Sequence, residues 1–348
     1  MESRSTSHSR HRNMKGDQEK EIITYSRNIF FPITNLCRNK CSYCGFREDP
    51  DGDFWVMSEE EVIELAREGK RSGCSEALIT AGEKPEVHQE MKFKLNEWGF
   101  PTTVDYVASL SEKLLDLGLL PHVNLGILDK EEMRKLRRWN ASIGLMLECA
   151  TDLPVHNDSP GKDPKKRFKM IREAGELKIP FTTGIMIGIG ERWEDRIKSL
   201  KKIKDLQEEY GHIQEIIIQP FIPKNETPME NSEPPANAKI SRTVTLAKKM
   251  LPDTSIQVPP NLISNLSELL RIGMDDLGGI STVTPDFINP KSPWPKISKL
   301  KSKINDIGLD LKERLPIYPR YAKKSEFMSN EVKKVVKELS NEEGLRKR

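Results

Sequence analysis

The sequence predicts an α/β protein with a (β/α)8 barrel of the TIM type. Eight short apolar runs alternate with stretches of helical periodicity between residues 28 and 307, and such repeated alternation is typical of parallel α/β folds. The runs are almost continuously apolar, as expected of parallel strands that are buried on both faces. A chain of 348 residues with 36% hydrophobic and 31% charged residues suits one large barrel with a charged surface. A doubly wound open sheet fits the same alternation and remains the alternative.

The apolar runs place the expected strands, and the helical spacing places the helices. Strands are expected over residues 28–33, 76–80, 122–125, 142–147, 181–187, 213–219 and 255–258, with a weak eighth strand beginning at 275–277. The first helix is expected after Ser58, whose hydroxyl suits an N-cap ahead of three glutamates in the first turn. Further helices are expected near residues 103–117, 130–138, 165–177, 193–208, 236–250, 265–270 and 298–307.

The barrel is expected over residues 21–322, and the sequence on either side of it is strongly polar. Residues 1–20 lack the apolar core of a secretory signal and predict a disordered tail. Residues 323–348 are rich in Lys, Glu and Ser and predict a charged helix or tail. No apolar run reaches the length of a membrane span, and a net charge of +3 gives no basis for nucleic-acid or membrane binding. We therefore expect a cytoplasmic protein, in which a reducing environment keeps thiols free.

Three of the five cysteines form a tight C-x3-C-x2-C motif directly after the first strand, at Cys37, Cys41 and Cys44. In a parallel barrel this position lies at the C-terminal face, where active sites are built. Thiolates suit iron–sulfur clusters or zinc. A structural zinc site needs four ligands, and no further Cys or His follows before Cys74. Three cysteines therefore favour an iron–sulfur cluster with one iron left open. Cys74 and Cys149 are interpreted as small buried apolar residues.

Polar or glycine-rich segments follow three other strands. Gly82 and Glu83 come after the second strand, where a glycine permits close backbone approach and a carboxylate can pair with an ammonium. Glu148 ends the apolar fourth strand, where a carboxylate is costly unless it is paired. Gly188 belongs to a glycine run after the fifth strand, whose spacing is not that of a dinucleotide-binding fingerprint. Each segment could equally be an ordinary turn, ion pair or close-packed strand.

Weaker candidates follow the remaining strands. Asp275 and Asp276 form a paired-carboxylate loop that we expect at the end of the eighth strand, suited to acid–base catalysis or to capping a helix. Gln219 and Asn261 are neutral hydrogen-bonding residues after the sixth and seventh strands, suited to a uracil-like ring or to ordinary loop contacts. His156, after the fourth strand, is either a proton carrier or a surface histidine.

The cysteine motif, with the aromatic Tyr43 just before its last cysteine, resembles that of the radical S-adenosylmethionine (SAM) superfamily. The resemblance implies one 4Fe-4S cluster held by Cys37, Cys41 and Cys44, whose open iron chelates the amino and carboxylate groups of SAM. It also implies that one electron from an external low-potential donor cleaves SAM to methionine and a 5′-deoxyadenosyl radical. The SAM contacts implied by this resemblance fall on Tyr43, Gly82, Glu83, Glu148 and Gly188. The sequence departs from the superfamily pattern at Ala81, where a first glycine is usual.

Further stretches narrow the resemblance to one family, the CofG subunits of 7,8-didemethyl-8-hydroxy-5-deazariboflavin (FO) synthase. They lie at residues 82–86, 153–165, 180–191, 211–219, 257–262 and 273–294, and the resemblance runs from about residue 28 to 319. It implies a carbon–nitrogen lyase and cyclase of coenzyme F-420 biosynthesis. The partner subunit CofH would make an adduct of a tyrosine-derived hydroxybenzyl group and a ribityliminouracil. The enzyme would close this adduct to FO with loss of ammonia, while SAM becomes 5′-deoxyadenosine and methionine.

Two other functions stay open at this stage. The same barrel and cluster serve other radical SAM enzymes, such as biotin-synthase-like enzymes or aromatic-amino-acid lyases, because fold and cluster do not fix the substrate. A non-enzyme, a zinc-binding scaffold on a barrel, is the second possibility. On the favoured hypothesis, Asp275 and Asp276 are catalytic and Gln219 and Asn261 bind the substrate.

Overall fold

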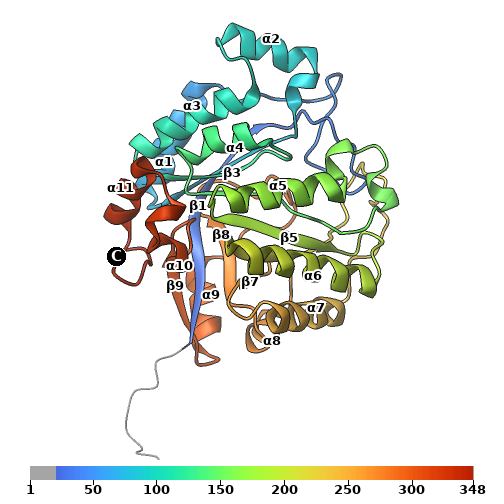
Figure 1. Ribbon diagram of the computed structural model, residues 1–348. Coiled ribbons are helices and arrows are strands. Elements are labelled where there is room, and N and C mark those ends of the chain that lie inside the picture. The colour runs from blue at the N-terminus through green and yellow to red at the C-terminus, as the bar shows by residue number, and fades with distance from the viewer. Residues whose placement is uncertain (1–20, 348) are drawn as a thin grey trace, which may run out of the picture.

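Strand β1 (Ile22–Thr34) is the seam at which the sheet closes into a barrel. Its later residues pair with β2 (Glu76–Ala81) and its middle residues with β8 (Asp276–Ser281), in parallel on both sides. The computed structural model, which describes residues 21–347, thus confirms the predicted (β/α)8 barrel (Figure 1). Because β1 pairs with β8 as well as with β2, the eight strands form a closed ring, which excludes the open sheet.

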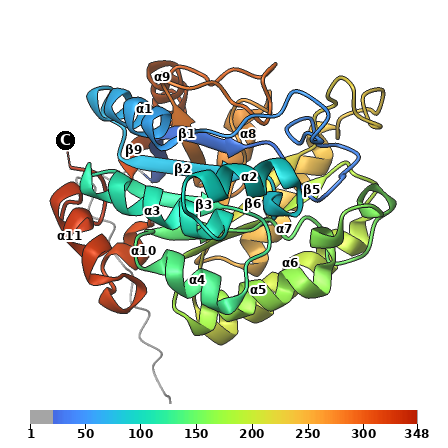
Figure 2. The same cartoon turned by 90° about the horizontal axis from the view of Figure 1, so that it is seen from above.

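Six further strands complete the barrel, and helices surround it (Figure 2). The strands are β3 (Leu120–Asn124), β4 (Ser142–Gly144), β5 (Phe181–Ile187), β6 (Ile213–Pro220) and β7 (Ser255–Gln257), together with β8. The helices are α1 (Glu59–Arg71), α2 (Gln89–Glu97), α3 (Thr103–Asp116), α4 (Lys130–Arg137), α5 (Pro164–Glu176), α6 (Trp193–Tyr210), α7 (Asn237–Met250), α8 (Leu266–Arg271), α9 (Ile297–Asn305), α10 (Pro319–Ala322) and α11 (Asn330–Leu339). No helix within residues 21–347 is both long and apolar enough to cross a membrane.

The alternation of side chains along β1 separates an outer apolar core from an inner lumen. Ile29 and Phe31 are fully buried in the apolar core between the strands and the helices, and Ile29 meets α1 at Gly69. Asn28 and Phe30 instead line the lumen of the barrel. This two-residue period is that of any β-strand. The apolar packing that stabilises the fold therefore lies mostly outside the strands.

The structure adds elements that the sequence did not predict. A ninth strand, β9 (Asp310–Arg314), pairs with Ile22–Ser26 at the start of β1, which makes β1 longer than the expected 28–33. Helix α2 was also not expected. Residues 1–20, predicted to be a disordered tail, lie outside the described residues.

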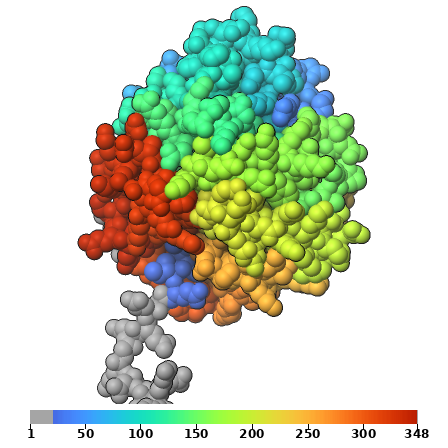
Figure 3. Space-filling model, in the orientation of Figure 1, coloured from blue at the N-terminus to red at the C-terminus, as the bar shows by residue number. Residues whose placement is uncertain are grey.

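The C-terminal segment packs closely against the barrel. In Figure 3 the red C-terminal residues form one surface patch beside the green residues of the earlier helices. Within it, α11 buries Val332, Val336 and Leu339 against the start of β3 and the segment after β9. The charged sequence predicted over 323–348 as a helix or tail therefore contains a helix with one apolar face that covers the N-terminal end of the barrel strands.

Arg314, the last residue of β9, occupies the barrel interior at that N-terminal end. Its guanidinium donates to both carboxylate oxygens of Asp276 at 2.6 and 2.8 Å and to Glu215 at 3.2 Å. A third buried carboxylate, Glu76, lies near enough for the charge of Arg314 to act on it. Burial raises the pKa of Glu76, and it raises the pKa of Glu215 to about 7, since one guanidinium faces three carboxylates. Burial and the Arg314 charge lower the pKa of His122 to about 4, so this neighbour adds no positive charge at neutral pH.

We expect the substitution Arg314→Gln to lower the free energy of unfolding by about 3–5 kcal/mol at pH 8, because it leaves buried carboxylates without their cation. The loss should be smaller at pH 5. The folded-state pKa of Glu215 is about 7, above the unfolded value of about 4.3, so its ionisation costs stability as the pH rises between these values. Urea denaturation followed by circular dichroism at both pH values measures this difference.

Arg320→Gln is the matched control, because Arg320 is exposed and, within residues 21–347, its side chain donates only to the Asp253 carbonyl, at 3.2 Å. A loss that is the same at pH 5 and pH 8, or no larger than that of the control, would contradict this account of the cluster.

Candidate active site

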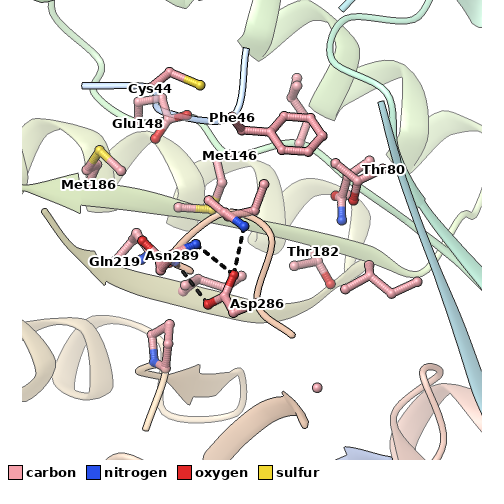
Figure 4. A pocket seen from close by; sticks show the side chains of 18 of the residues that line it. Cys44, Phe46, Thr80, Met146, Glu148, Thr182, Met186, Gln219, Asp286 and Asn289 are labelled. Carbon is pink, nitrogen blue, oxygen red and sulfur yellow. Dashed lines mark hydrogen bonds between the residues drawn. The ribbon is translucent and has the colours of Figure 1, made fainter. Parts of the chain in front are cut away.

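The cysteine loop after β1 lies at the mouth of a cavity of about 420 Å³ that runs down the barrel lumen. Cys37, Cys41 and Cys44 all line this cavity. Figure 4 shows part of the cavity wall, with Cys44 and Glu148 near each other and Asp286 hydrogen-bonded to neighbouring side chains. The expected position of the cysteines at the C-terminal end of the strands is thus found. Cys74 and Cys149 are buried, as interpreted from the sequence.

Gly82 allows the end of β2 to touch the cysteine loop. A Cβ atom at this position would lie 1.9 Å from the Leu36 carbonyl oxygen and 2.8 Å from the Cys37 Cβ atom. The neighbouring amide of Glu83 donates to the Cys37 sulfur at 3.2 Å. The glycine after the second strand is therefore required by close backbone approach, as the sequence suggested.

The buried carboxylate of Glu83 holds several loops together. It is paired with Arg38 at 2.7 Å and accepts from the Ile127 amide at 3.0 Å. The guanidinium of Arg167, from α5, lies 3.7 Å away. Gly161 stands so close that a Cβ atom there would lie 1.6 Å from a carboxylate oxygen of Glu83. Glu83 thus links the cysteine loop to the segments that follow β3 and β4.

The segment after β4 packs directly on the cysteine loop. The Ser159 hydroxyl donates to the Cys41 sulfur at 3.4 Å and accepts from the Lys40 amide at 3.1 Å. The Ser42 amide donates to the Val155 carbonyl at 3.0 Å. These contacts explain the position of the 153–165 stretch, which the sequence singled out without assigning it a role.

Glu148 is buried in the cavity wall with a left-handed backbone, at φ 64°. The expected strand 142–147 ends at Gly144, and pairing with β5 resumes only at Glu148. One carboxylate oxygen binds the Lys162 ammonium at 2.5 Å, and the other, Oε2, has no hydrogen-bond partner among the described residues. Burial alone would raise the pKa of Glu148, but the charges of Lys162 and Arg167 outweigh it and hold that pKa below its usual value.

Tyr43 is buried beside the cavity, and its hydroxyl is 2.9 Å from His156 Nε2. The two rings also pack edge to face, with their centroids 5.6 Å apart. Burial and the Lys162 charge lower the pKa of His156 to about 4, so this imidazole is neutral at neutral pH. His156 thus supports Tyr43 rather than lying free at the surface.

The remaining predicted ligand residues differ in their access to the cavity. Gln219 lines it. The Gly188 amide is bound by the Glu191 carboxylate at 3.0 Å, and Gly188 does not line the cavity. Asn261 lies one step behind the wall and donates to Asp286 at 2.9 Å. Asp286 itself lines the cavity and also accepts from Asn289 at 3.1 Å.

Asp275 and Asp276 do not end the eighth strand as expected; Asp276 begins it. Both therefore lie at the end of the barrel opposite to the cysteines. Asp275 is paired with Lys248 at 2.7 Å, and Asp276 is bound by Arg314. The correction has a simple cause: the sequence between 276 and 281 is rich in glycine and reads as a turn, yet it forms the strand.

Sequence reasoning missed several charged groups of the wall. Lys162, Arg167, Lys224 and Asp286 all line the cavity. Burial lowers the pKa of Lys224, although the neighbouring Cys44, Asp286 and Glu148 oppose that shift. Lys162 and Asp286 fall within stretches that were singled out, but nothing local in the sequence shows that they turn inward.

The donor set fits an iron–sulfur cluster and a charged ligand. Amide and hydroxyl donors already point at the sulfurs of Cys37 and Cys41, as is typical of cluster thiolates. Burial raises the pKa of Cys37 to about 11, a cost that coordination to a cation offsets. Within residues 21–347, no three Cys, His, Asp or Glu side chains converge tightly enough for a ready-made single-ion site. Glu148 lines the same cavity, and its Oε2, which has no hydrogen-bond partner among the described residues, offers an acceptor to a second ligand.

A barrel with this cysteine loop defines the class of protein. The sequence profile of the radical SAM superfamily matches residues 31–203. The chain is 47% identical over 334 residues to 7,8-didemethyl-8-hydroxy-5-deazariboflavin synthase of Methanopyrus kandleri, covering 93% of this chain and 99% of that one. It is 51% identical to the enzyme of the same name from Archaeoglobus fulgidus, over 87% of this chain and 92% of that one. The chain belongs to the 7,8-didemethyl-8-hydroxy-5-deazariboflavin synthase family of radical SAM proteins.

Solved structures share the fold. Methylornithine synthase (PylB) superposes with a TM-score of 0.64 at 18% identity, over 84% of this chain and 83% of that one. The hydrogenase maturase HydG from Carboxydothermus hydrogenoformans gives a TM-score of 0.66 at 20% identity, over 88% and 70%. At these identities the likeness shows the barrel architecture alone.

We expect Gly82→Ala to disrupt cluster assembly, because the added methyl group cannot fit against the Leu36 carbonyl and must displace the cysteine loop. The overpacking should also cost about 1–3 kcal/mol of stability. Iron content and visible absorption after anaerobic reconstitution measure the effect. Gly99→Ala is the control for a strained substitution without a clash: its φ is +78°, but apart from its chain neighbours no atom of residues 21–347 lies within 4 Å of the added group. Full iron loading of Gly82→Ala would show that this approach is not needed.

Proposed function

We propose that this chain closes the hydroxybenzyl–ribityliminouracil adduct to the deazaflavin FO, with loss of ammonia, while SAM is converted to 5′-deoxyadenosine and methionine. One observation carries the proposal: the three-cysteine loop opens onto a lumen large enough for a small molecule, in a chain that matches FO synthases over nearly their whole length. The product is the chromophore precursor of coenzyme F-420.

Cys37, Cys41 and Cys44 would hold a 4Fe-4S cluster, and SAM would bind beside it. When bound, the two groups supply the radical that starts the reaction by taking a hydrogen atom from the substrate. Glu148 offers its free carboxylate oxygen as an acceptor, and Tyr43 contributes a buried aromatic wall. Glu83 holds the cysteine loop in register through Arg38.

The deeper wall would hold the adduct. Gln219 lines the lumen, and among the described residues its amide makes only a long 3.5 Å contact to the Pro220 carbonyl, so both of its polar atoms are available to a heterocycle. Asp286, fixed by Asn261 and Asn289, offers a positioned carboxylate. The enclosed barrel keeps water and stray hydrogen donors away from reactive species.

The same proposal names the partners and the compartment. CofH would supply the adduct, and an external low-potential donor would supply the electron. The reaction is consistent with a cytoplasmic enzyme, in which free thiols persist.

We expect the anaerobically reconstituted enzyme to form fluorescent deazaflavin when it is given the adduct, SAM and a reductant. Cys37→Ala should lose both the cluster absorption band and product formation. Cys74→Ala, which removes a buried thiol that does not line the cavity, should keep both.

Other outcomes separate the alternatives. SAM cleavage without deazaflavin, under conditions in which a related FO synthase succeeds, would reject the substrate and leave a different radical SAM enzyme. A zinc-loaded protein that never cleaves SAM would favour the scaffold.

We expect Glu148→Gln to weaken SAM binding about tenfold, or about 1.4 kcal/mol, because an amide replaces one of two charged acceptor oxygens. Isothermal titration of the reconstituted enzyme with SAM measures the change. Glu64→Gln, on the exposed face of α1, is the control. Unchanged affinity in Glu148→Gln would remove Glu148 from the SAM site.

A further inference from the structure

In the half of the barrel lumen near the N-terminal ends of the strands, polar side chains line the wall, whereas barrel interiors are usually filled by branched apolar residues. Asn28, Glu76, His122, Gln257 and Arg314 all line it. Asn28 stands six residues before the end of β1, about 20 Å along the strand from the cysteine loop. This polar floor belongs to the same cavity as the cysteines but lies far from them.

Asn28 has an unusual environment. Its side chain is 1% exposed, yet neither the amide nitrogen nor the amide oxygen has a hydrogen-bond partner among the described residues. Gly279 provides the space, because a Cβ atom there would lie 2.3 Å from the Asn28 amide nitrogen. A buried, unpaired amide destabilises a protein, so the site suits a partner that supplies both a donor and an acceptor.

Gln257, at the end of β7, repeats the pattern on the other side of β8. Its side-chain oxygen is buried and unpartnered among the described residues, in a residue that is 7% exposed. Gly278 makes room for it, since a Cβ atom there would lie 2.0 Å from its amide nitrogen. Two neutral amides from β1 and β7 therefore present unused hydrogen-bonding atoms to one space.

The charges around these amides restrict the ligand. Arg314 is engaged by Asp276 and Glu215, and the Glu76 carboxylate lies in the same wall. Three carboxylates around one guanidinium disfavour a phosphate or another anion. Hydroxyl groups, which both donate and accept, suit neutral amides and carboxyl groups.

We propose that this polar floor binds the unphosphorylated ribityl chain of the substrate, with Asn28 and Gln257 as its hydrogen-bonding contacts. The inference rests on the proposed function for the identity of the chain. It implies that the substrate enters with its polyol first, so that the ring system stays near the mouth and the cysteines. Asn28 and Gln257 then determine specificity without touching the reacting atoms.

The test is equilibrium binding to the reconstituted enzyme, followed by deazaflavin fluorescence. Three probes are compared: FO, the same deazaflavin with a methyl group in place of the ribityl chain, and FO phosphorylated on its terminal hydroxyl. We expect wild-type enzyme to bind FO at least about tenfold more tightly than either other probe. Asn28→Ala and Gln257→Ala should each weaken FO binding about three- to tenfold and leave binding of the methyl probe unchanged.

Asn96→Ala, an exposed asparagine at the surface of α2, is the matched control and should keep the wild-type preference. Unchanged binding of the methyl probe shows that a variant is folded. If Asn28→Ala does not fold, the inference is tested by the three wild-type affinities and by the affinities of Gln257→Ala. Equal wild-type affinity for FO and the methyl probe, or a preference that survives in both variants, would overturn the inference and leave a floor that holds only water.

The outcome is separable from the proposed reaction. A wild-type preference for FO that disappears in the variants, in an enzyme that makes no deazaflavin from the adduct, would support the polyol site and reject the reaction. Deazaflavin formation by an enzyme that binds FO and the methyl probe equally would support the reaction and reject the polyol site.

Discussion

The buried carboxylate of Glu83 is the constraint on which the upper site depends. It joins the cysteine loop, through Arg38, to the segments after β3 and β4, through the Ile127 amide and Arg167. The segment after β4 approaches the carboxylate so closely at Gly161 that no larger residue fits at this position. An acidic group on a strand end is costly in apolar surroundings unless it is paired. Here the pairing itself defines the mouth of the barrel, so the residue expected to contact SAM also builds the site around it.

The opposite end of the lumen follows a different rule. A (β/α)8 barrel can fill its interior with apolar side chains, but Arg314 and its carboxylate partners take that space in this chain. Buried charges seldom improve stability over an apolar filling. Their presence leaves a polar hollow, while the stability of the fold comes from the apolar layer outside the strands. β9 and α11 close this end and keep the charged cluster away from water.

Sequence patterns predicted much of this architecture because they are local. The apolar run of β5 matches the structure from Phe181 to Ile187, and Ser58 is the N-cap of α1 as expected. The sequence did not predict contacts between residues that are distant along the chain. Glycines of β8 suggested a turn and placed Asp276 at the wrong end of the strand, whereas they actually make room for Asn28 and Gln257. Arg314 is brought to its partners by β9, a strand that the sequence pattern did not predict.

The cavity therefore has two ends of different chemistry. The mouth carries sulfur ligands, a left-handed Glu148 and a set of cations, which suit a charged cofactor. The floor carries neutral amides beside carboxylates that repel anions. A ligand with an anionic or metal-binding part is favoured at the mouth, and a neutral polyol at the floor. This gradient orients a molecule before any contact with its reacting ring is made. Orientation by remote groups is a general way to use binding energy for reactivity, since that energy offsets the entropic cost of fixing the reacting atoms.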